Sequence, residues 1–126
     1  MHLEHVAIDV ADPAAFKDWW VKNLGMRVSS VNPGFLTDDS GTFVLEVYRT
    51  ERTAAAPDYW KIHPMTLHIA FLSENVDKDV ARLAAAGAKT CEVVHKPGFD
   101  MAVLQDPQGV AIQLVKRDKC IFMAPR

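Results

Sequence analysis

The chain has 126 residues, a mass of 14.0 kDa and a formal net charge of −2. About half of the residues are apolar and a quarter are charged, which is typical of one soluble globular domain. This composition offers no basic surface for nucleic acid or an anionic membrane, and no apolar run reaches the roughly 20 residues of a membrane helix. The N-terminus lacks a signal-peptide pattern and we expect both cysteines to be free thiols, so the sequence predicts a cytoplasmic protein.

The first half begins with a predicted strand and helix. In the segment LEHVAIDVAD, from Leu3 to Asp12, alternation puts His5 on the sheet face opposite the apolar residues Val6 and Ile8. The pair Asp12-Pro13 is a strong helix start, and Gly25 is a typical C-terminal stop. We expect the helix between them to pack its two tryptophans against the sheet.

Three strands are predicted to complete the first half, at 26–31, 35–37 and 42–48, with turns between them. The last of these contains Glu46 inside the nearly continuous apolar run FVLEVY. Because burying an unpaired carboxylate is very costly, Glu46 must be exposed, paired with a cation or bound to a metal. A linker follows, in which Tyr59 and Trp60 either anchor the loop or contact a ligand.

The second half repeats this order of elements. A strand is predicted at 65–72 with His68 in the place of His5, then a helix that begins near 73–75 and ends at Gly87. Further strands are predicted at 89–94, 100–104 and 110–115. Gln113 interrupts the last one at the place that Glu46 occupies in the first half. A repeat of about half the chain, with polar groups at matching places, is its main feature.

The sequence therefore predicts a single α+β domain built from two modules. Module one spans residues 3–49, the linker 50–64, and module two 65–116. For the tail, 117–126, the sequence predicts no structure, because it shows no periodicity.

The chain resembles the vicinal oxygen chelate superfamily, which includes glyoxalase I, bleomycin resistance proteins and extradiol dioxygenases. The resemblance is carried by LEHVAIDVADPAAF and NLGM in the first half, and by TLHIAF, AAAGAK and AVLQDPQGVAIQLV in the second. It implies two βαβββ modules whose curved sheets enclose an open barrel, with a metal held by the first and last strands of each. The positions that match the metal ligands are His5, Glu46, His68 and Gln113. Such donors suit a divalent transition ion such as Zn²⁺, Ni²⁺, Co²⁺, Mn²⁺ or Fe²⁺.

The resemblance implies a glyoxalase-like metal-dependent lyase or isomerase that acts on a small carbonyl or vicinal-oxygen substrate. The chain departs from glyoxalase I at Gln113, where a glutamate is expected, because an amide cannot accept a proton. Proton transfer would then fall on Glu46 as the catalytic base. We expect a small-molecule substrate and a homodimer, and the modules pair either within one chain or between two.

Two alternatives remain open. An extradiol-type dioxygenase would use two histidines and one carboxylate around Fe(II), but Gln113 would crowd that site, and the family's dioxygenases place their carboxylate in the final strand. A metal-free binding or resistance protein would instead sequester a small molecule on aromatic side chains. The candidates for such stacking are Trp60, Tyr59, Tyr48 and Phe99.

Overall fold

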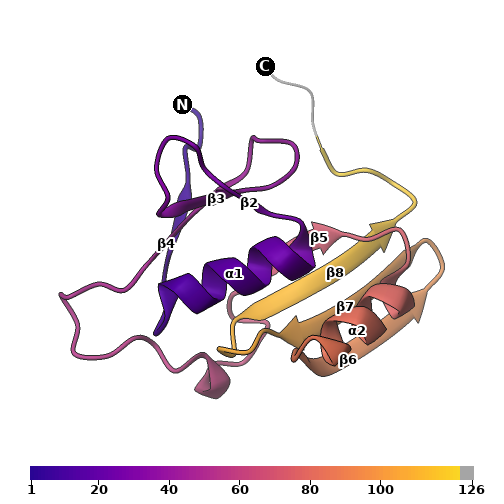
Figure 1. Ribbon diagram of the computed structural model, residues 1–126. Helices are drawn as coiled ribbons and strands as arrows, with labels where there is room; N and C mark the ends of the chain where they lie inside the picture. Colours follow the sequence, from indigo (N-terminus) through magenta and orange to yellow (C-terminus); the bar gives the residue numbers. More distant parts are fainter. Residues whose placement is uncertain (123–126) are drawn as a thin grey trace. The chain divides into compact units, whose positions relative to one another are not determined.

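The computed structural model of the chain describes residues 1–122. The chain forms two compact units, Met1–Asp58 and a second that begins at Tyr59. Each unit contains one four-stranded sheet and one α-helix, in the order strand, helix and three strands (Figure 1). The predicted repeat is therefore confirmed at the level of secondary structure.

The first unit, module one, has its strands in the order β1-β4-β3-β2, with β1 parallel to β4 and the other pairs antiparallel. The Asp12 carboxylate accepts a hydrogen bond from the Ala15 amide (3.0 Å) and so caps the helix, which ends at Gly25 with φ +68°. Trp20 is fully buried, whereas Trp19 is half-buried. The elements are β1 (Val6–Asp9), α1 (Pro13–Leu24), β2 (Arg27–Val28), β3 (Phe35–Thr37) and β4 (Val44–Tyr48).

The second unit, module two, repeats this topology with longer strands, in the order β5-β8-β7-β6. Asn75 caps its helix by accepting from the Lys78 amide (3.0 Å), as Asp12 does in module one. The buried residues of β7 and β8 and Leu83 of the helix form its core. The elements are a short 3-10 helix η1 (Tyr59–Lys61), β5 (Ile69–Leu72), α2 (Val76–Ala85), β6 (Lys89–Lys96), β7 (Phe99–Gln105) and β8 (Ala111–Arg117).

Several predicted strand limits are wrong. The strand expected at 26–31 keeps two residues, because the Ser29 hydroxyl accepts from the Val31 amide (3.1 Å) and starts a turn. The strand expected from 65 begins at Ile69, since the Thr66 amide donates to the His63 carbonyl (2.8 Å) in a turn. β1 starts only at Val6, which is exposed instead of facing the core.

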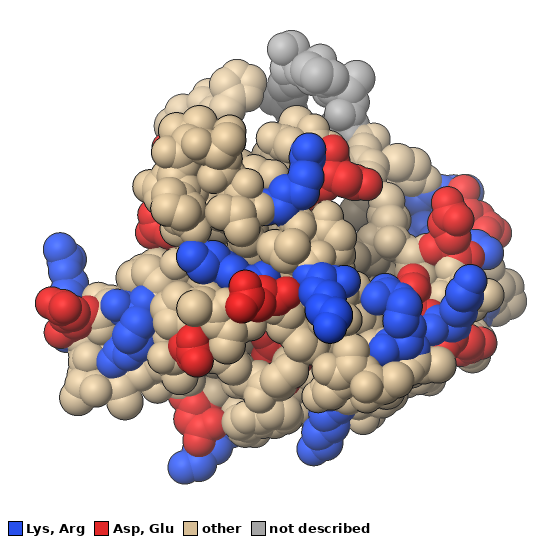
Figure 2. Space-filling model, viewed as in Figure 1, with Lys and Arg blue, Asp and Glu red and all other residues tan. Residues whose placement is uncertain are grey.

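The ends of the chain add two further points. β8 continues to Arg117, so the first residue of the predicted tail belongs to the sheet, whereas 123–126 lie outside the described residues. In the part of the chain that the structure describes, neither helix is long and apolar enough to cross a membrane. On the face shown in Figure 2, acidic and basic side chains are interspersed, as expected from the small net charge.

Candidate functional site

Module one places His5 and Glu46 on the same face of its sheet. Ala7 pairs with Glu46 across the parallel strands β1 and β4, and His5 lies two residues before Ala7. His5 lies just before β1, but its ring packs on Phe35, the strand partner of Glu46, so His5 lies on the face that carries Glu46. The strand rise and spacing put the two Cα atoms roughly 8 Å apart, within reach of a shared ligand.

The surroundings of this pair hold the histidine more firmly than the carboxylate. The His5 ring packs edge-to-face against Phe35 (5.2 Å between centroids), and its Nδ1 lies 2.8 Å from a Glu4 carboxylate oxygen. Phe35 faces Glu46 across β3 and β4. Glu46 is half-buried, and its side chain has no hydrogen bond or ion pair with any described residue. Its carboxylate is therefore free to take a ligand.

Module two has Gln113 at the equivalent place of β8, and His68 directly precedes β5. Ala70 pairs with Gln113 across the parallel strands β5 and β8, and His68 lies two residues before Ala70. This register matches that of Ala7 and Glu46 in module one. The equivalence of Glu46 and Gln113 is thus a property of the folded modules, whereas the predicted equivalence of the two histidines, each of which directly precedes its strand, remains a prediction.

The donors of module two are more buried. Gln113 is 9 % exposed, and its Nε2 donates only a weak hydrogen bond to the Met101 Sδ (3.7 Å) among the described residues. The His68 Nδ1 is buried and finds no hydrogen-bond partner within residues 1–122. A buried polar atom without a hydrogen-bond partner costs about 1–3 kcal/mol, so His68 is a natural position for a bound ion or an ordered water.

Within residues 1–122, no group of three or more His, Cys, Asp and Glu side chains is close enough to hold a metal ion. The predicted donors are found as two pairs, one in each module. Each pair combines an imidazole with an oxygen donor, of which only Glu46 is charged and able to accept a proton.

Two of the aromatic residues that the sequence singles out as stacking surfaces, Tyr59 and Trp60, have structural contacts. The ring and amide of Trp60 lie so close to Gly109 that a Cβ there would be 2.9 Å from them, and Gly109 has φ +87°. The Gln105 side chain donates to the Tyr59 carbonyl (3.5 Å) and to the Gly109 carbonyl (3.1 Å). These contacts support the prediction that Tyr59 and Trp60 anchor the loop.

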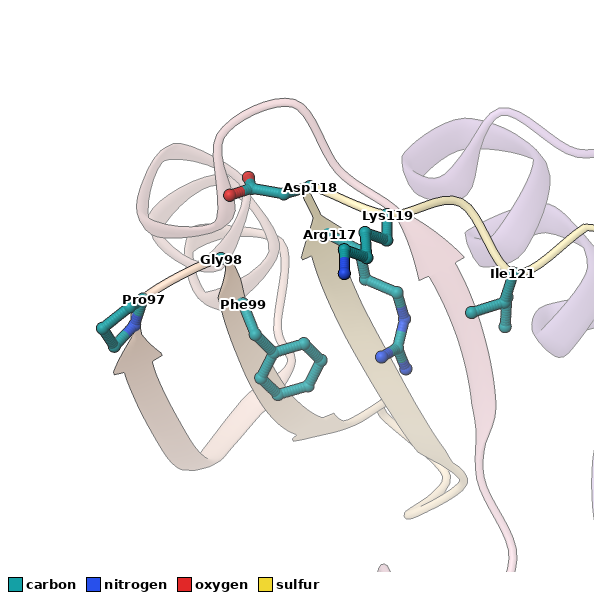
Figure 3. Close-up of a pocket in the computed structure, with 7 residues that line it drawn as sticks. All are labelled: Pro97, Gly98, Phe99, Arg117, Asp118, Lys119 and Ile121. Atoms are coloured by element: carbon teal, nitrogen blue, oxygen red, sulfur yellow. The ribbon is translucent and has the colours of Figure 1, made fainter.

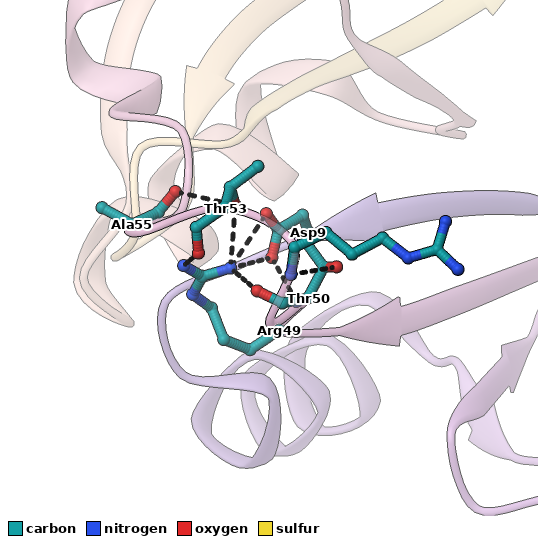
Figure 4. A network of polar contacts seen from close by, with 6 residues as sticks. Asp9, Arg49, Thr50, Thr53 and Ala55 are labelled. Carbon is teal, nitrogen blue, oxygen red and sulfur yellow. Dashed lines mark hydrogen bonds and ion pairs between the residues drawn. The ribbon is translucent and has the colours of Figure 1, made fainter.

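A polar network that the sequence does not reveal fixes the other end of the linker to module one (Figure 4). The Arg49 guanidinium donates to the Asp9 carboxylate (3.2 Å), to the Thr53 carbonyl (2.8 Å) and to the Thr50 carbonyl. The same carboxylate accepts from the Thr50 amide (3.1 Å). Asp9 and Arg49 are 40 positions apart, so only the parallel pairing of β1 and β4 brings them together.

A second feature missed by the sequence lies where β8 ends. Arg117 packs its guanidinium over the Phe99 ring (4.8 Å to the centroid) and borders a hollow on each side. Figure 3 shows the two side chains next to each other. The alternation of Gln113, Val115 and Arg117 along one face was the available signal, but the strand was predicted to stop at Val115.

The model of one protein family, described as the Glyoxalase/Bleomycin resistance protein/Dioxygenase superfamily, matches residues 2–114. The comparison with curated protein sequences found no match.

Three solved structures illustrate the likeness. A glyoxalase family protein from Bacillus cereus has a TM-score of 0.76 at 15% identity, covering 93% of this chain and 94% of that chain. TnmS3, an antibiotic binding protein from Streptomyces sp. CB03234, has a TM-score of 0.68 at 22% identity, with coverages of 94% and 99%. A glyoxalase/bleomycin resistance protein from Albidiferax ferrireducens T118 has a TM-score of 0.66 at 21% identity, with coverages of 91% and 98%. These likenesses confirm the predicted fold, an α+β arrangement of two βαβββ modules.

Proposed function

Since this chain belongs to the glyoxalase/bleomycin resistance protein/dioxygenase superfamily, we propose that it is a metal-dependent lyase or isomerase that acts on a small carbonyl or vicinal-oxygen substrate. The observation that carries the proposal is the repeated placement of an imidazole beside an oxygen donor, His5 with Glu46 and His68 with Gln113. Packing alone does not explain why polar side chains stand at equivalent positions of two otherwise apolar strands. A binding site that uses both pairs would explain it.

The residues fit a divalent transition ion. Two imidazoles, a carboxylate and an amide oxygen are ligands that Zn²⁺, Ni²⁺, Co²⁺, Mn²⁺ and Fe²⁺ accept, and a six-coordinate ion would keep two positions open. The unpartnered Nδ1 of His68 and the unpaired carboxylate of Glu46 are the local observations that favour an ion there. We propose that both pairs bind the same ion.

Such an ion, when bound, supplies Lewis acidity that polarises a substrate carbonyl. The protein's own contribution is proton transfer, for which Glu46 is the suitable base among the four donors. Its carboxylate accepts a proton from the carbon next to the carbonyl and returns it to a neighbouring atom. Gln113 has no such capacity. Phe35, packed on His5 and paired with Glu46 across the strands, orients the histidine.

Metal analysis tests the proposal directly. The protein is purified without a histidine tag or added metal, and its metal content is measured by elemental analysis next to that of two variants. We expect about one equivalent of a divalent transition metal in the wild type and its loss in His68→Ala. His95→Ala is the matched control, because His95 contacts Asp77 and Asp100 and belongs to neither pair. Unchanged metal content and thermal stability in both His5→Ala and His68→Ala would overturn the proposal.

A second candidate function is metal-free binding of a small molecule. It is favoured by an apolar hollow of about 370 Å³ in module two, which is within the size range of ligand pockets. The similar fold of TnmS3, an antibiotic binding protein, supports it as well. A protein of this kind would purify without stoichiometric metal, so the same elemental analysis separates the two candidates.

The predicted homodimer remains a prediction, and so does the choice between pairing of modules within one chain or between two. Light scattering coupled to size-exclusion chromatography would give the molar mass in solution. A mass of twice 14.0 kDa would support the homodimer.

A further inference from the structure

Module two has an apolar hollow beside the end of β8, with a volume of about 370 Å³. Leu72 and Val115, paired across β5 and β8, form its floor, and Leu72 is 68 % exposed. Three residues that follow β8 form another wall of the hollow: Cys120, Ile121 and Phe122. A site of this size and lining suits the apolar part of a small organic ligand.

Arg117 stands at the edge of this hollow and separates it from a second one, which Pro97, Phe99 and Lys119 help to line. The Phe99 ring covers one face of the Arg117 guanidinium. Phe99 and Arg117 are strand partners across β7 and β8. Among residues 1–122, Arg117 makes no ion pair or hydrogen bond through its side chain. In Figure 3 the guanidinium extends beside Phe99, whereas the Asp118 carboxylate points the other way, toward Gly98.

An arginine held in this way is prepared to bind an anion. The ring contact restricts the guanidinium plane, so less conformational entropy is lost when its N–H groups donate to a carboxylate, often in bidentate geometry. Asp118 also lines the hollow beside Leu72 and Val115, but its carboxylate points toward Gly98, and Arg117 is the one cationic residue among those that line this hollow. A positive charge next to apolar walls favours a monoanion with an apolar body.

We propose that Arg117 and the apolar hollow beside it form a binding site for an aromatic carboxylate. The carboxylate pairs with the guanidinium, and the ring system packs on Leu72, Val115 and Phe122. The hollow extends to Ala70, the strand partner of Gln113, but the anion-binding group, Arg117, lies four residues beyond Gln113 on β8, roughly 13 Å along the strand. The proposal therefore does not depend on metal binding.

The test uses 2-naphthoate and its neutral isostere 2-naphthamide, titrated into metal-free protein by isothermal titration calorimetry. Because a charge-assisted hydrogen bond contributes more than a neutral one, we expect the wild type to bind the carboxylate at least about tenfold more tightly than the amide. Arg117→Gln should remove this preference. Lys119→Gln, the matched control, should keep it, since Lys119 lies beside the second hollow only.

The alkylation rates of the two free cysteines report where the ligand binds. Cys120 lines the hollow, whereas Cys91 lies on β6 and does not, and both are exposed. We expect 2-naphthoate to slow alkylation of Cys120 by iodoacetamide several-fold in the wild type, with no change at Cys91. Leu72→Glu, at an exposed position, should abolish this protection by placing a negative charge in the hollow.

Three results would overturn the proposal. They are equal affinity of the wild type for the acid and the amide, an unchanged preference in Arg117→Gln, and protection of Cys91 together with Cys120. Failure of the metal analysis described above would leave these measurements unaffected, so the two proposals stand or fall separately.

Discussion

The two modules share one topology but equip it with different chemistry. At equivalent registers, module one has Ala7 opposite Glu46 and module two has Ala70 opposite Gln113. The first pair of donors carries a negative charge on a half-buried side chain, while the second is neutral and more buried. The repeat thus determines where a polar side chain stands, whereas the residue type decides whether it can accept a proton.

The difference is larger two residues further along the first strand of each module. Asp9, opposite Tyr48, belongs to the polar network with Arg49 that closes this end of module one (Figure 4). Leu72, opposite Val115, occupies the equivalent place in module two and is the floor of an apolar hollow. The same position of the fold therefore anchors a linker in one module and offers a ligand site in the other.

The largest effect that would sharpen this comparison concerns the two oxygen donors. We expect Glu46→Ala to weaken metal binding by roughly 100-fold or more, and Gln113→Ala by about tenfold, since a neutral amide oxygen is a poorer ligand than a carboxylate. Competition with a chromogenic chelator would measure both affinities. Glu74→Ala, an exposed glutamate outside both pairs, is the control. Equal losses in the two variants would show that the modules contribute alike.

The second prediction concerns stability at the equivalent positions Asp9 and Leu72. Asp9→Ala should lower the free energy of unfolding by about 2 kcal/mol, because the partly buried Arg49 guanidinium and the Thr50 amide lose a charged partner. Leu72→Ala should change it by only about 0.5 kcal/mol, since that side chain is mostly exposed. Urea unfolding of both variants provides the comparison, and similar values would contradict the structural role of the network.

The third prediction makes module two resemble module one. Gln113→Glu is nearly isosteric, and a carboxylate next to a divalent cation stays ionised. We expect roughly tenfold tighter metal binding and, if the site accepts the hemithioacetal of methylglyoxal and glutathione, a gain in glyoxalase activity. Without metal the variant should be less stable than the wild type, because the new carboxylate is buried. Weaker metal binding, or wild-type glyoxalase activity that the substitution removes, would show that the amide is the functional donor.

The smallest expected effect is on the pH dependence of stability and concerns His95 in module two. The His95 ring lies between the carboxylates of Asp100 (2.9 Å) and Asp77 (3.1 Å). The hydrogen bond to Asp100, followed by the negative charge of Asp77, raises the pKa of His95 above its ordinary value of 6.5. A raised pKa in the folded state means that the contribution to stability is fully present below pH 6.5 and is lost as the pH rises through the folded-state pKa.

Comparison of the wild type with His95→Gln by urea unfolding at several pH values would detect this effect. The wild type should be slightly more stable at pH values below 6.5, and the two should converge at alkaline pH. A difference that is independent of pH would exclude the charge on His95 as its cause.

Local signals of the sequence were sufficient for much of the fold. Asp12 and Asn75 predicted both helix starts, because a side-chain oxygen at that place satisfies a free amide of the first turn. The alternation of polar and apolar residues predicted that His5 and Glu46 share a face, which agrees with the packing of His5 on Phe35, the strand partner of Glu46. The same expectation for His68 and Gln113 remains a prediction. Strand limits were predicted less well, because turns such as that at Thr66 depend on hydrogen bonds made in the folded chain.

What the sequence determined by itself is thus the repeated topology and the equivalent places of Glu46 and Gln113 in β4 and β8, both of which follow from periodicity within short segments. Only the tertiary structure decided the contacts between segments far apart in the chain. The pairing of β1 with β4 brings Asp9 to Arg49, and the pairing of β7 with β8 brings Phe99 to Arg117. The physical reason is that sequence periodicity fixes the direction of a side chain relative to its own strand, whereas its partner is set by which strands lie next to each other and in what register.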